Sequence, residues 1–181
     1  MKLWKKISLI GLSTALIVMA AKNPMVGGHE MFPSKDIVDN AVNSADHTTL
    51  VAAVKAAGLV DTLKGAGPFT VFAPTNAAFD KLPAGTVDTL LKPENKGTLV
   101  KVLTYHVVPG RIGSADLKKM IKMGHGKAQL KTASGETLTA WMKGSMIVLT
   151  DEKGGNSTVT QADVFQSNGV IHVVDTVLMP N

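Results

Sequence analysis

The chain has 181 residues, of which 45% are hydrophobic, 18% are charged and only 4% are aromatic, with a formal charge of +5. This length suits one domain with a buried core, and the hydrophobic content is too high for a disordered chain. The absence of cysteine excludes disulfides, thiolate metal sites, lipid-anchored cysteines and cysteine nucleophiles. Composition thus predicts a folded domain with a largely aliphatic core, and it indicates no particular function.

The first twenty residues have the pattern of a secretory signal peptide. Lys2, Lys5 and Lys6 precede an apolar run over 7–20 that ends in small residues. The run is shorter than the ~20 apolar residues that span a bilayer, so we expect a cleaved signal peptide over 1–20 and no stable membrane insertion afterwards. Cleavage lowers the charge to about +2, without the basic cluster that nucleic-acid binding requires. We expect a protein that is exported to the periplasm or the extracellular space.

The first third of the mature chain is predicted to be helical. Residues 21–33 contain two glycines and two prolines and are predicted to form an extended lead-in. Ser34 is predicted to cap a first helix. A second helix is predicted to start near 46–48 and to stop at Gly58, with a short third helix over 59–64.

A buried strand is predicted over 69–73, because apolar side chains lie on both of its faces. Thr75 or Asn76 is expected to cap the turn that follows. Further helices are predicted to begin at Thr86, at Thr98 and near Leu117. In the second of these, the apolar positions recur at helical spacing and include His106, and Pro109-Gly110 is expected to end it.

The apolar period changes to two in the last third of the chain. Apolar positions at 130, 138–142, 146–148, 159 and 170–174 alternate between glycine-containing turns. Four or five strands at this spacing are predicted to pair antiparallel through hairpins. Helices first and strands afterwards predict an α+β domain, with N-terminal helices packed on a mainly antiparallel sheet from the C-terminal half.

Three segments resemble the fasciclin domain family. They are GPFTVFAPTNAAF at 67–79, the dipeptide Tyr105-His106, and SNGVIHVVDTVLMP at 167–180. In this order they match the first homology box, the central Tyr-His dipeptide and the second homology box of the family. The resemblance covers 34–180 and implies a single, monomeric module of the exported bacterial type. It also implies a non-enzymatic function in cell adhesion, or in binding proteins or glycans at a cell surface or in the matrix.

The aromatic residues of the first box are expected to be structural. Phe69, Phe72 and Phe79 are three of only eight aromatic residues in the chain. Their clustering within eleven positions predicts that they lie at the centre of the core.

The polar residues of the boxes are expected to be structural as well. Asn76 is expected to hydrogen-bond to the backbone of neighbouring segments, and Asn168-Gly169 is expected to form a turn. His106 and His172 are expected to be buried neutral imidazoles. Each then needs one partner for its N–H group and one for its lone pair.

The resemblance also implies a partner-binding region. In animal relatives, segments around the Tyr-His dipeptide and an Asp-Ile pair before the second box are implicated in integrin binding. The corresponding residues here are Tyr105, His106, Asp163 and Val164, with valine in place of isoleucine. The alternative is that Val164 belongs to the core and Asp163 caps a bend.

No residue pattern indicates catalysis. Nucleophile elbows, phosphate-binding loops, metalloprotease helices and paired carboxylates are all absent from the sequence. We therefore expect no enzyme activity and no cofactor.

A competing hypothesis is a periplasmic carrier that holds copper(I) or a small apolar molecule between the helices and the sheet. Copper(I) favours thioether and imidazole ligands. Such side chains also have an ordinary structural role, because methionine fills gaps in cores that contain few aromatic residues. The candidate ligands are Met25, His29 and Met31 before the helices, and Met120, Met123 and His125 later in the chain.

Overall fold

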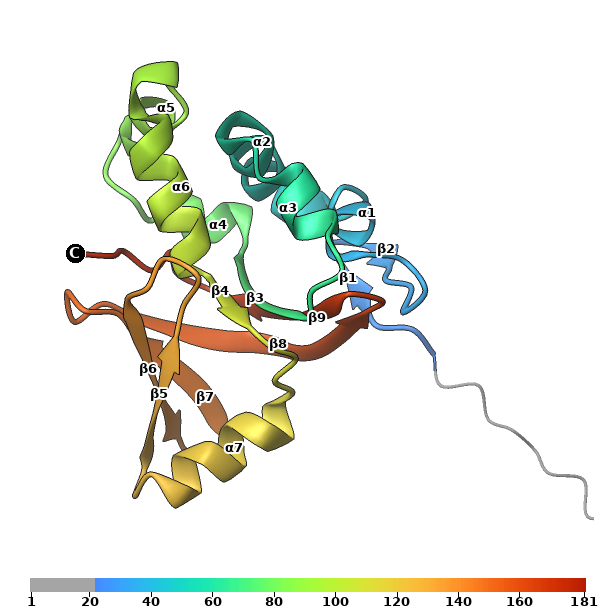
Figure 1. Ribbon diagram of the computed structural model, residues 1–181, viewed down its shortest axis with the longest axis vertical. Helices are drawn as coiled ribbons and strands as arrows, with labels where there is room; N and C mark the ends of the chain where they lie inside the picture. Colours follow the sequence, from blue (N-terminus) through green and yellow to red (C-terminus); the bar gives the residue numbers. More distant parts are fainter. Residues whose placement is uncertain (1–21) are drawn as a thin grey trace, which may run out of the picture.

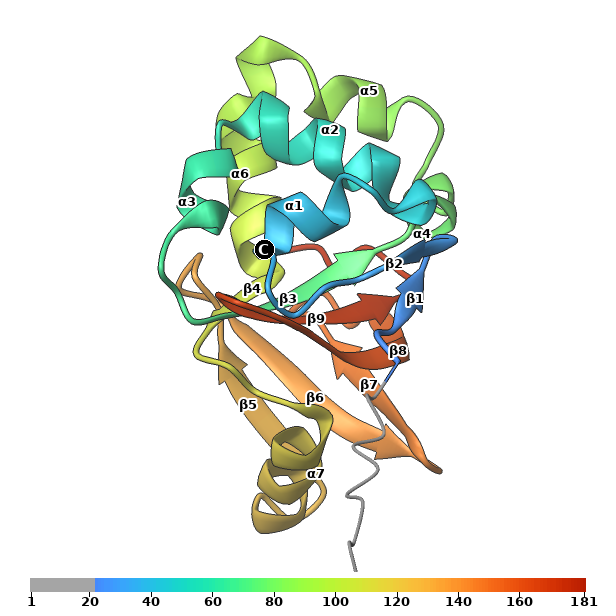
Figure 2. The same cartoon turned by 90° about the vertical axis from the view of Figure 1, so that its right-hand side faces the viewer.

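The computed structural model describes residues 22–181, so the predicted signal peptide over 1–20 lies outside the described residues. The fold is α+β, as predicted. Figures 1 and 2 show a group of helices on one side of a twisted sheet and a single helix at the opposite end of the molecule.

The first helix, α1 (Ile37–Ala41), starts later than predicted. Its N-terminal cap is Asp36, whose carboxylate accepts a hydrogen bond from Asp39 N at 2.8 Å. The prediction that Ser34 is the cap is wrong. The backbone N–H of Ile37, which a cap at that position would bind, donates instead to the side chain of Asn168 at 3.0 Å.

The next helical elements agree with the predictions. A 3-10 turn, η1 (Ala45–His47), leads into α2 (Thr48–Ala57). This helix ends at Gly58, which has φ = 71°, a conformation that glycine adopts without steric cost. The short helix α3 (Val60–Lys64) follows.

The predicted buried strand is β3 (Phe69–Pro74), and the turn after it is capped by Thr75. The Thr75 hydroxyl accepts a hydrogen bond from Ala78 N at 3.2 Å, at the start of α4 (Asn76–Asp80). Three further elements continue the chain: α5 (Thr86–Leu90), the 3-10 turn η2 (Pro93–Asn95) and α6 (Lys96–Tyr105).

The strand β4 (Val107–Pro109) was not predicted. The expected helix ran on to Pro109, whereas α6 ends at Tyr105 with His106 as its C-terminal cap. The chain then pairs antiparallel with β3, placing Phe69 opposite Pro109. A three-residue strand is too short to show an alternating pattern, and its two valines are both buried.

Within residues 22–181 the main sheet has seven strands, in the order β4-β3-β9-β8-β7-β6-β5. The C-terminal strands pair antiparallel with their neighbours, which confirms the predicted hairpins. In contrast, β3 and β9 pair in parallel, from Phe69 opposite Gly169 to Pro74 opposite Val174. This unpredicted pairing places the first and last family segments side by side. The strand bounds are β5 (Lys127–Lys131), β6 (Thr137–Lys143), β7 (Met146–Thr150), β8 (Asn156–Gln166) and β9 (Gly169–Val174).

The lead-in was predicted to be extended, but it is folded back on itself. It forms a small hairpin of β1 (Met25–Val26) and β2 (His29–Glu30). After the hairpin, Met31 N donates to Pro24 O at 2.9 Å, and the Met31 side chain is only 2% exposed. Val26 and Met31 therefore belong to the core.

The sheet separates two apolar clusters. One lies between the helices and the sheet and contains Phe79, with half-buried Phe69 packed against it. The other contains Phe72 and lies toward α7 (Ser114–Met123), which packs on β5 and β6. Two of the three phenylalanines are thus fully within the core, and Phe69 lies at its edge.

The helices of this fold are short. The longest among residues 22–181 are α2, α6 and α7, with ten residues each. None of the helices in this range has both the length and the apolar character that crossing a membrane requires.

Replacing Phe72 tests the importance of the second cluster. Its side chain is completely buried, so Phe72→Ala should lower the free energy of unfolding by ~3–5 kcal/mol. Phe165→Ala is the matched control, because Phe165 is 41% exposed and its loss should cost ~0.5 kcal/mol or less. Urea denaturation followed by circular dichroism measures both. Equal losses would contradict the assignment of Phe72 to the core.

Candidate functional site

His106 is a buried neutral imidazole with both ring nitrogens hydrogen-bonded. Its Nε2 accepts a hydrogen bond from Leu178 N at 3.0 Å, so the proton is on Nδ1, which donates to Val102 O at 2.8 Å. Burial lowers the pKa of His106 to about 4. The ring therefore connects the end of α6 to the C-terminal segment and is not available as a catalytic base at neutral pH.

Tyr105 is fully buried beside His106. Its hydroxyl donates to Thr137 O at 3.0 Å and accepts from Glu152 N at 3.2 Å. Removal from solvent raises the pKa of the Tyr105 phenol to about 12. The side chain thus joins α6 to the start of β6 and to the turn between β7 and β8.

His172 lies in β9 and is completely buried. Its Nδ1 accepts from Asp163 N at 3.2 Å, so Nε2 carries the proton and donates to Ile112 O at 2.8 Å. The ring stacks on Phe72 with centroids 5.6 Å apart. Burial lowers the pKa of His172 below its usual value, so this imidazole is also neutral at pH 7.

Asp163 positions the start of α7. Its carboxylate accepts hydrogen bonds from the backbone N–H of Ser114, at 2.7 Å, and from the Ser114 hydroxyl. The backbone of Asp163 has φ = 61°, at an irregularity in the pairing of β8 with β9. Residues other than glycine seldom adopt this conformation, and the contacts of both its carboxylate and its N–H hold it there. Val164 beside it is fully buried.

The side chain of Asn76 binds the start of α2. Its oxygen accepts from Thr49 N at 3.0 Å and from the Thr48 hydroxyl at 3.2 Å, and its amide donates to Ala45 O at 2.9 Å. These bonds satisfy backbone groups that the helix leaves unpaired at its N-terminus.

Asn168 has the same role for two other helices. Its oxygen accepts from Ile37 N, and its amide donates to Leu63 O at 2.7 Å and Gly65 O at 2.9 Å. A side chain on the neighbouring Gly169 would have its Cβ 2.1 Å from Phe69 O. This dipeptide therefore joins α1 and α3 to the sheet at a point where only glycine fits.

The residues implied to bind a partner lie mostly inside the protein. Tyr105, His106 and Val164 are buried, and the Asp163 carboxylate is engaged by Ser114. A partner that docks on the folded surface cannot reach the first three side chains. The hydrogen bonds of Tyr105 and His106 connect α6 to the segments around Thr137, Glu152 and Leu178. Those of Asp163 position the start of α7.

The candidate copper ligands do not come together as one set. In the hairpin, Met25 is exposed and Met31 faces the core, so their sulfur atoms point to different environments. Met120, Met123 and His125 are exposed around the end of α7. Met120 is 36% exposed, and the buried residues of α7 are Leu117 and Ile121.

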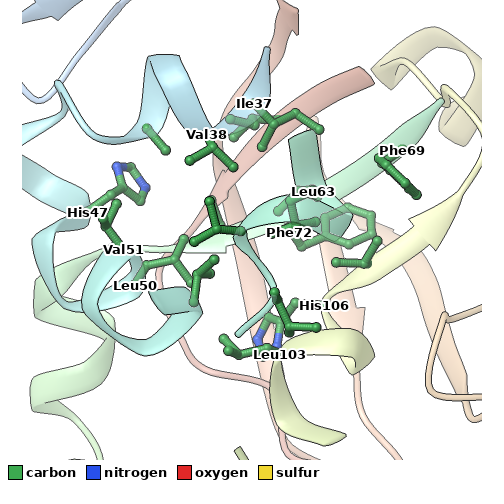
Figure 3. A pocket seen from close by; sticks show the side chains of 18 of the residues that line it. Ile37, Val38, His47, Leu50, Val51, Leu63, Phe69, Phe72, Leu103 and His106 are labelled. Carbon is green, nitrogen blue, oxygen red and sulfur yellow. The ribbon is translucent and has the colours of Figure 1, made fainter. Parts of the chain in front are cut away.

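The described residues also form an apolar pocket of about 100 Å³ between the helices and the sheet (Figure 3). Its walls come from α1, α2, α3, β3, β9 and the end of α6, including Ile37, Leu50, Leu63, Phe72 and Leu103. Almost all of the lining is hydrocarbon, which suits an apolar ligand.

Ser44 and His47 form a buried pair in this pocket, and the sequence analysis did not identify them. The Ser44 hydroxyl is 2.8 Å from His47 Nδ1, and His47 is 3% exposed. Burial lowers the pKa of His47 below its usual value. The Ser-x-x-His spacing across a helix start was a weak signal, because nothing in it indicated burial.

Known proteins share both the sequence pattern and the fold of this chain. A fasciclin domain profile matches residues 45–180. Protein sll1483 of Synechocystis is 51% identical over 144 residues, covering 80% of this chain and 73% of that protein. The cell surface glycolipoprotein MPB83 of Mycobacterium bovis is 37% identical over 167 residues, covering 89% and 68%. A domain pair from the insect cell adhesion molecule fasciclin I has the same fold, with a TM-score of 0.71 at 19% identity, over 81% of this chain and 51% of that one.

The neutral histidines predict acid-sensitive stability. The pKa of His106 is about 4 in the folded state and about 6.5 when unfolded, so the unfolded chain binds the extra proton as the pH falls through this window. Stability should decrease by on the order of 3 kcal/mol from pH 7 to pH 4 through His106 alone. His47 and His172 act in the same direction.

Urea denaturation at several pH values measures this loss. In His106→Gln, which retains an acceptor for Leu178 N, the decrease should be clearly shallower. His29→Gln at an exposed position is the control. If His106→Gln loses stability with pH as steeply as the wild type, the buried imidazole is not the cause.

Proposed function

The chain belongs to the fasciclin family, and we propose on that basis that it is an exported, non-enzymatic interaction module that mediates adhesion at the cell surface or matrix. The chain shares its fold with a domain pair of an insect adhesion molecule, and one of its bacterial relatives bears the name of a cell surface protein. The signal-peptide pattern supports export to the periplasm or beyond.

The residues of the family motifs are mostly buried, which supports binding of the partner by other, exposed side chains. The side chains of Tyr105, His106, His172 and Asn168 make their hydrogen bonds inside the protein. Their role is to hold the scaffold. Exposed side chains are then left to contact the partner.

The observation that carries this proposal is a basic face on α7. We use this name for Lys118, Lys119 and Lys122 with the adjoining Lys127, all of which are exposed. Within residues 22–181 the ion-paired lysines are Lys64, Lys81 and Lys101, so the lysines of the basic face form no ion pair within that range.

Apolar groups are exposed beside these charges. Met120 is 36% exposed and Met123 is 71% exposed. The acidic residue of the helix, Asp116, is oriented toward the N-terminus, where its carboxylate accepts from Gly113 N at 3.3 Å. The exposed face of α7 therefore suits an acidic protein or an anionic glycan, with the methionines adding apolar contact area.

Charge removal on α7 tests this surface. We expect Lys118→Gln, Lys119→Gln and Lys122→Gln together to weaken binding of the mature protein to the host cell envelope about tenfold, as expected for three exposed charge contacts. Binding of the wild type should also weaken with added salt. Sedimentation of the protein with isolated envelopes measures both effects.

The matched control changes the same charge elsewhere. Lys92, Lys96 and Lys153 are exposed and lie outside α7, so the triple glutamine variant at these positions should bind like the wild type. Protease or glycosidase treatment of the envelopes separates a protein partner from a glycan. Equal binding by the two triple variants would exclude the basic face as the contact surface.

A second candidate function is the transport of a small apolar ligand, and the pocket favours it. An apolar pocket lined by Val38, Leu50, Val54 and Phe69 lies between the helices and the sheet, where the carrier hypothesis places its ligand. Adhesion through α7 and ligand binding in this pocket use separate surfaces, so one does not exclude the other.

A further inference from the structure

One buried polar atom in the apolar pocket lacks a hydrogen-bond partner. Among the described residues, His47 Nε2 is buried and unpaired, and His47 lines the pocket. Figure 3 shows the ring on the α2 side, beside Val38, Val51 and Leu50. The other buried imidazole of the lining, His106, uses both of its nitrogens. A buried polar group without a partner is costly, and the pocket places this one where a ligand could satisfy it.

The hydrogen bond on the other side of the ring identifies what His47 offers. The Ser44 hydroxyl has His47 Nδ1 as its one hydrogen-bond partner among the described residues. If the hydroxyl donates to Nδ1, the ring proton lies on Nε2, and the Ala73 carbonyl, which interacts with the ring as an acceptor, favours this tautomer. Burial lowers the pKa of His47 overall, whereas the Ala73 carbonyl, which faces the ring, raises it, as the nearby Asp46 carboxylate also does. The Ala73 carbonyl lies outside hydrogen-bond geometry with Nε2, which therefore stays unpaired. His47 thus presents an unused N–H donor.

The charge and size of the pocket restrict the ligand further. His47 is neutral, because burial lowers its pKa, and an ionised headgroup in a hydrocarbon-lined site would have no counter-charge. The volume of about 100 Å³ is smaller than the ~150 Å³ cavity that binds benzene in another protein. Lys55 and Thr62 of the lining are exposed, so the pocket reaches the surface beside α2 and α3. A slender chain can enter there with one end in the pocket and the rest extending through the opening, whereas a fused ring system is too bulky.

We propose that this pocket binds an uncharged, unbranched hydrocarbon chain with one carbonyl or ether oxygen, and that His47 Nε2–H donates a hydrogen bond to that oxygen. The proposal rests on the second candidate function, the transport of an apolar ligand. It names the chemical class of the ligand and the residue that orients it.

Three probes of equal chain length test the ligand class: 2-nonanone, nonane and nonanoate. Titration of the mature protein, followed by calorimetry and by methyl NMR shifts of the pocket residues, gives the affinities. We expect 2-nonanone to bind at least tenfold more tightly than nonane, because only the ketone accepts the Nε2 hydrogen bond. Nonanoate should bind more weakly than the ketone. In the wild type, the Nε2–H resonance of His47 should shift with 2-nonanone and not with nonane.

The variants separate the role of His47 from that of the pocket. His47→Phe should reduce the affinity for 2-nonanone to that for nonane and leave the affinity for nonane unchanged. His29→Phe is the matched control at an exposed position and should change neither. Val51→Phe, which narrows the pocket, should weaken both probes. Thermal unfolding checks that each variant is folded.

The possible failures are distinguishable. Equal binding of ketone and alkane, with no effect of His47→Phe and no shift of the Nε2–H resonance, would overturn the assignment of His47 and leave the carrier function standing. Failure of all three probes to bind the folded wild type would overturn the carrier function together with this proposal. Neither result bears on adhesion through α7.

Discussion

The parallel pairing of β3 with β9 is the constraint on which the other contacts depend. The two strands are the second and third in the sheet, between β4 and β8, and they are almost completely buried. At the start of the pairing, the backbones of β3 and β9 approach so closely that Gly169 has no room for a side chain beside Phe69. Because both faces of this pair are covered, one set of strands supports an apolar cluster on each side. The helices of the first cluster cover one face of the sheet, and α7 packs against β5 and β6 in the second cluster.

Buried side chains that bond to backbone groups connect the helices to the buried pair β3–β9. Asn168 reaches α1 and the end of α3, and Asn76 reaches the start of α2. His106 and His172 use both ring nitrogens in the same way. Side chains whose polar atoms are all used in such contacts specify the fold, whereas His47 in the apolar pocket keeps a buried ring nitrogen without a partner. The family motifs therefore identify the scaffold, while binding has to be sought in the pocket and on exposed surfaces such as α7.

The elements with a strong repeating pattern could be predicted from the sequence, and those defined by distant contacts could not. The helix that ends at Gly58 and the C-terminal hairpins have clear periods and turn residues. The strand β4 has only three residues, and its role appears only when β3 is beside it. Parallel pairing joins segments about a hundred positions apart, and no local pattern reports it. His47 was missed for the same reason, because its burial is created by α1, the hairpin and β3.

The large separation between β3 and β9 along the chain has a consequence for folding. Residues 169–174 supply the strand between β3 and β8, and Leu178 and Met179 supply the last hydrogen bonds to His106 and Asp151. Without β9, the pair β4–β3 and the four strands β8–β7–β6–β5 have no hydrogen-bonded connection to each other. Pairing between segments so far apart in the chain is intrinsically slow, so we expect the insertion of β9 to limit the rate at which the two parts of the sheet join.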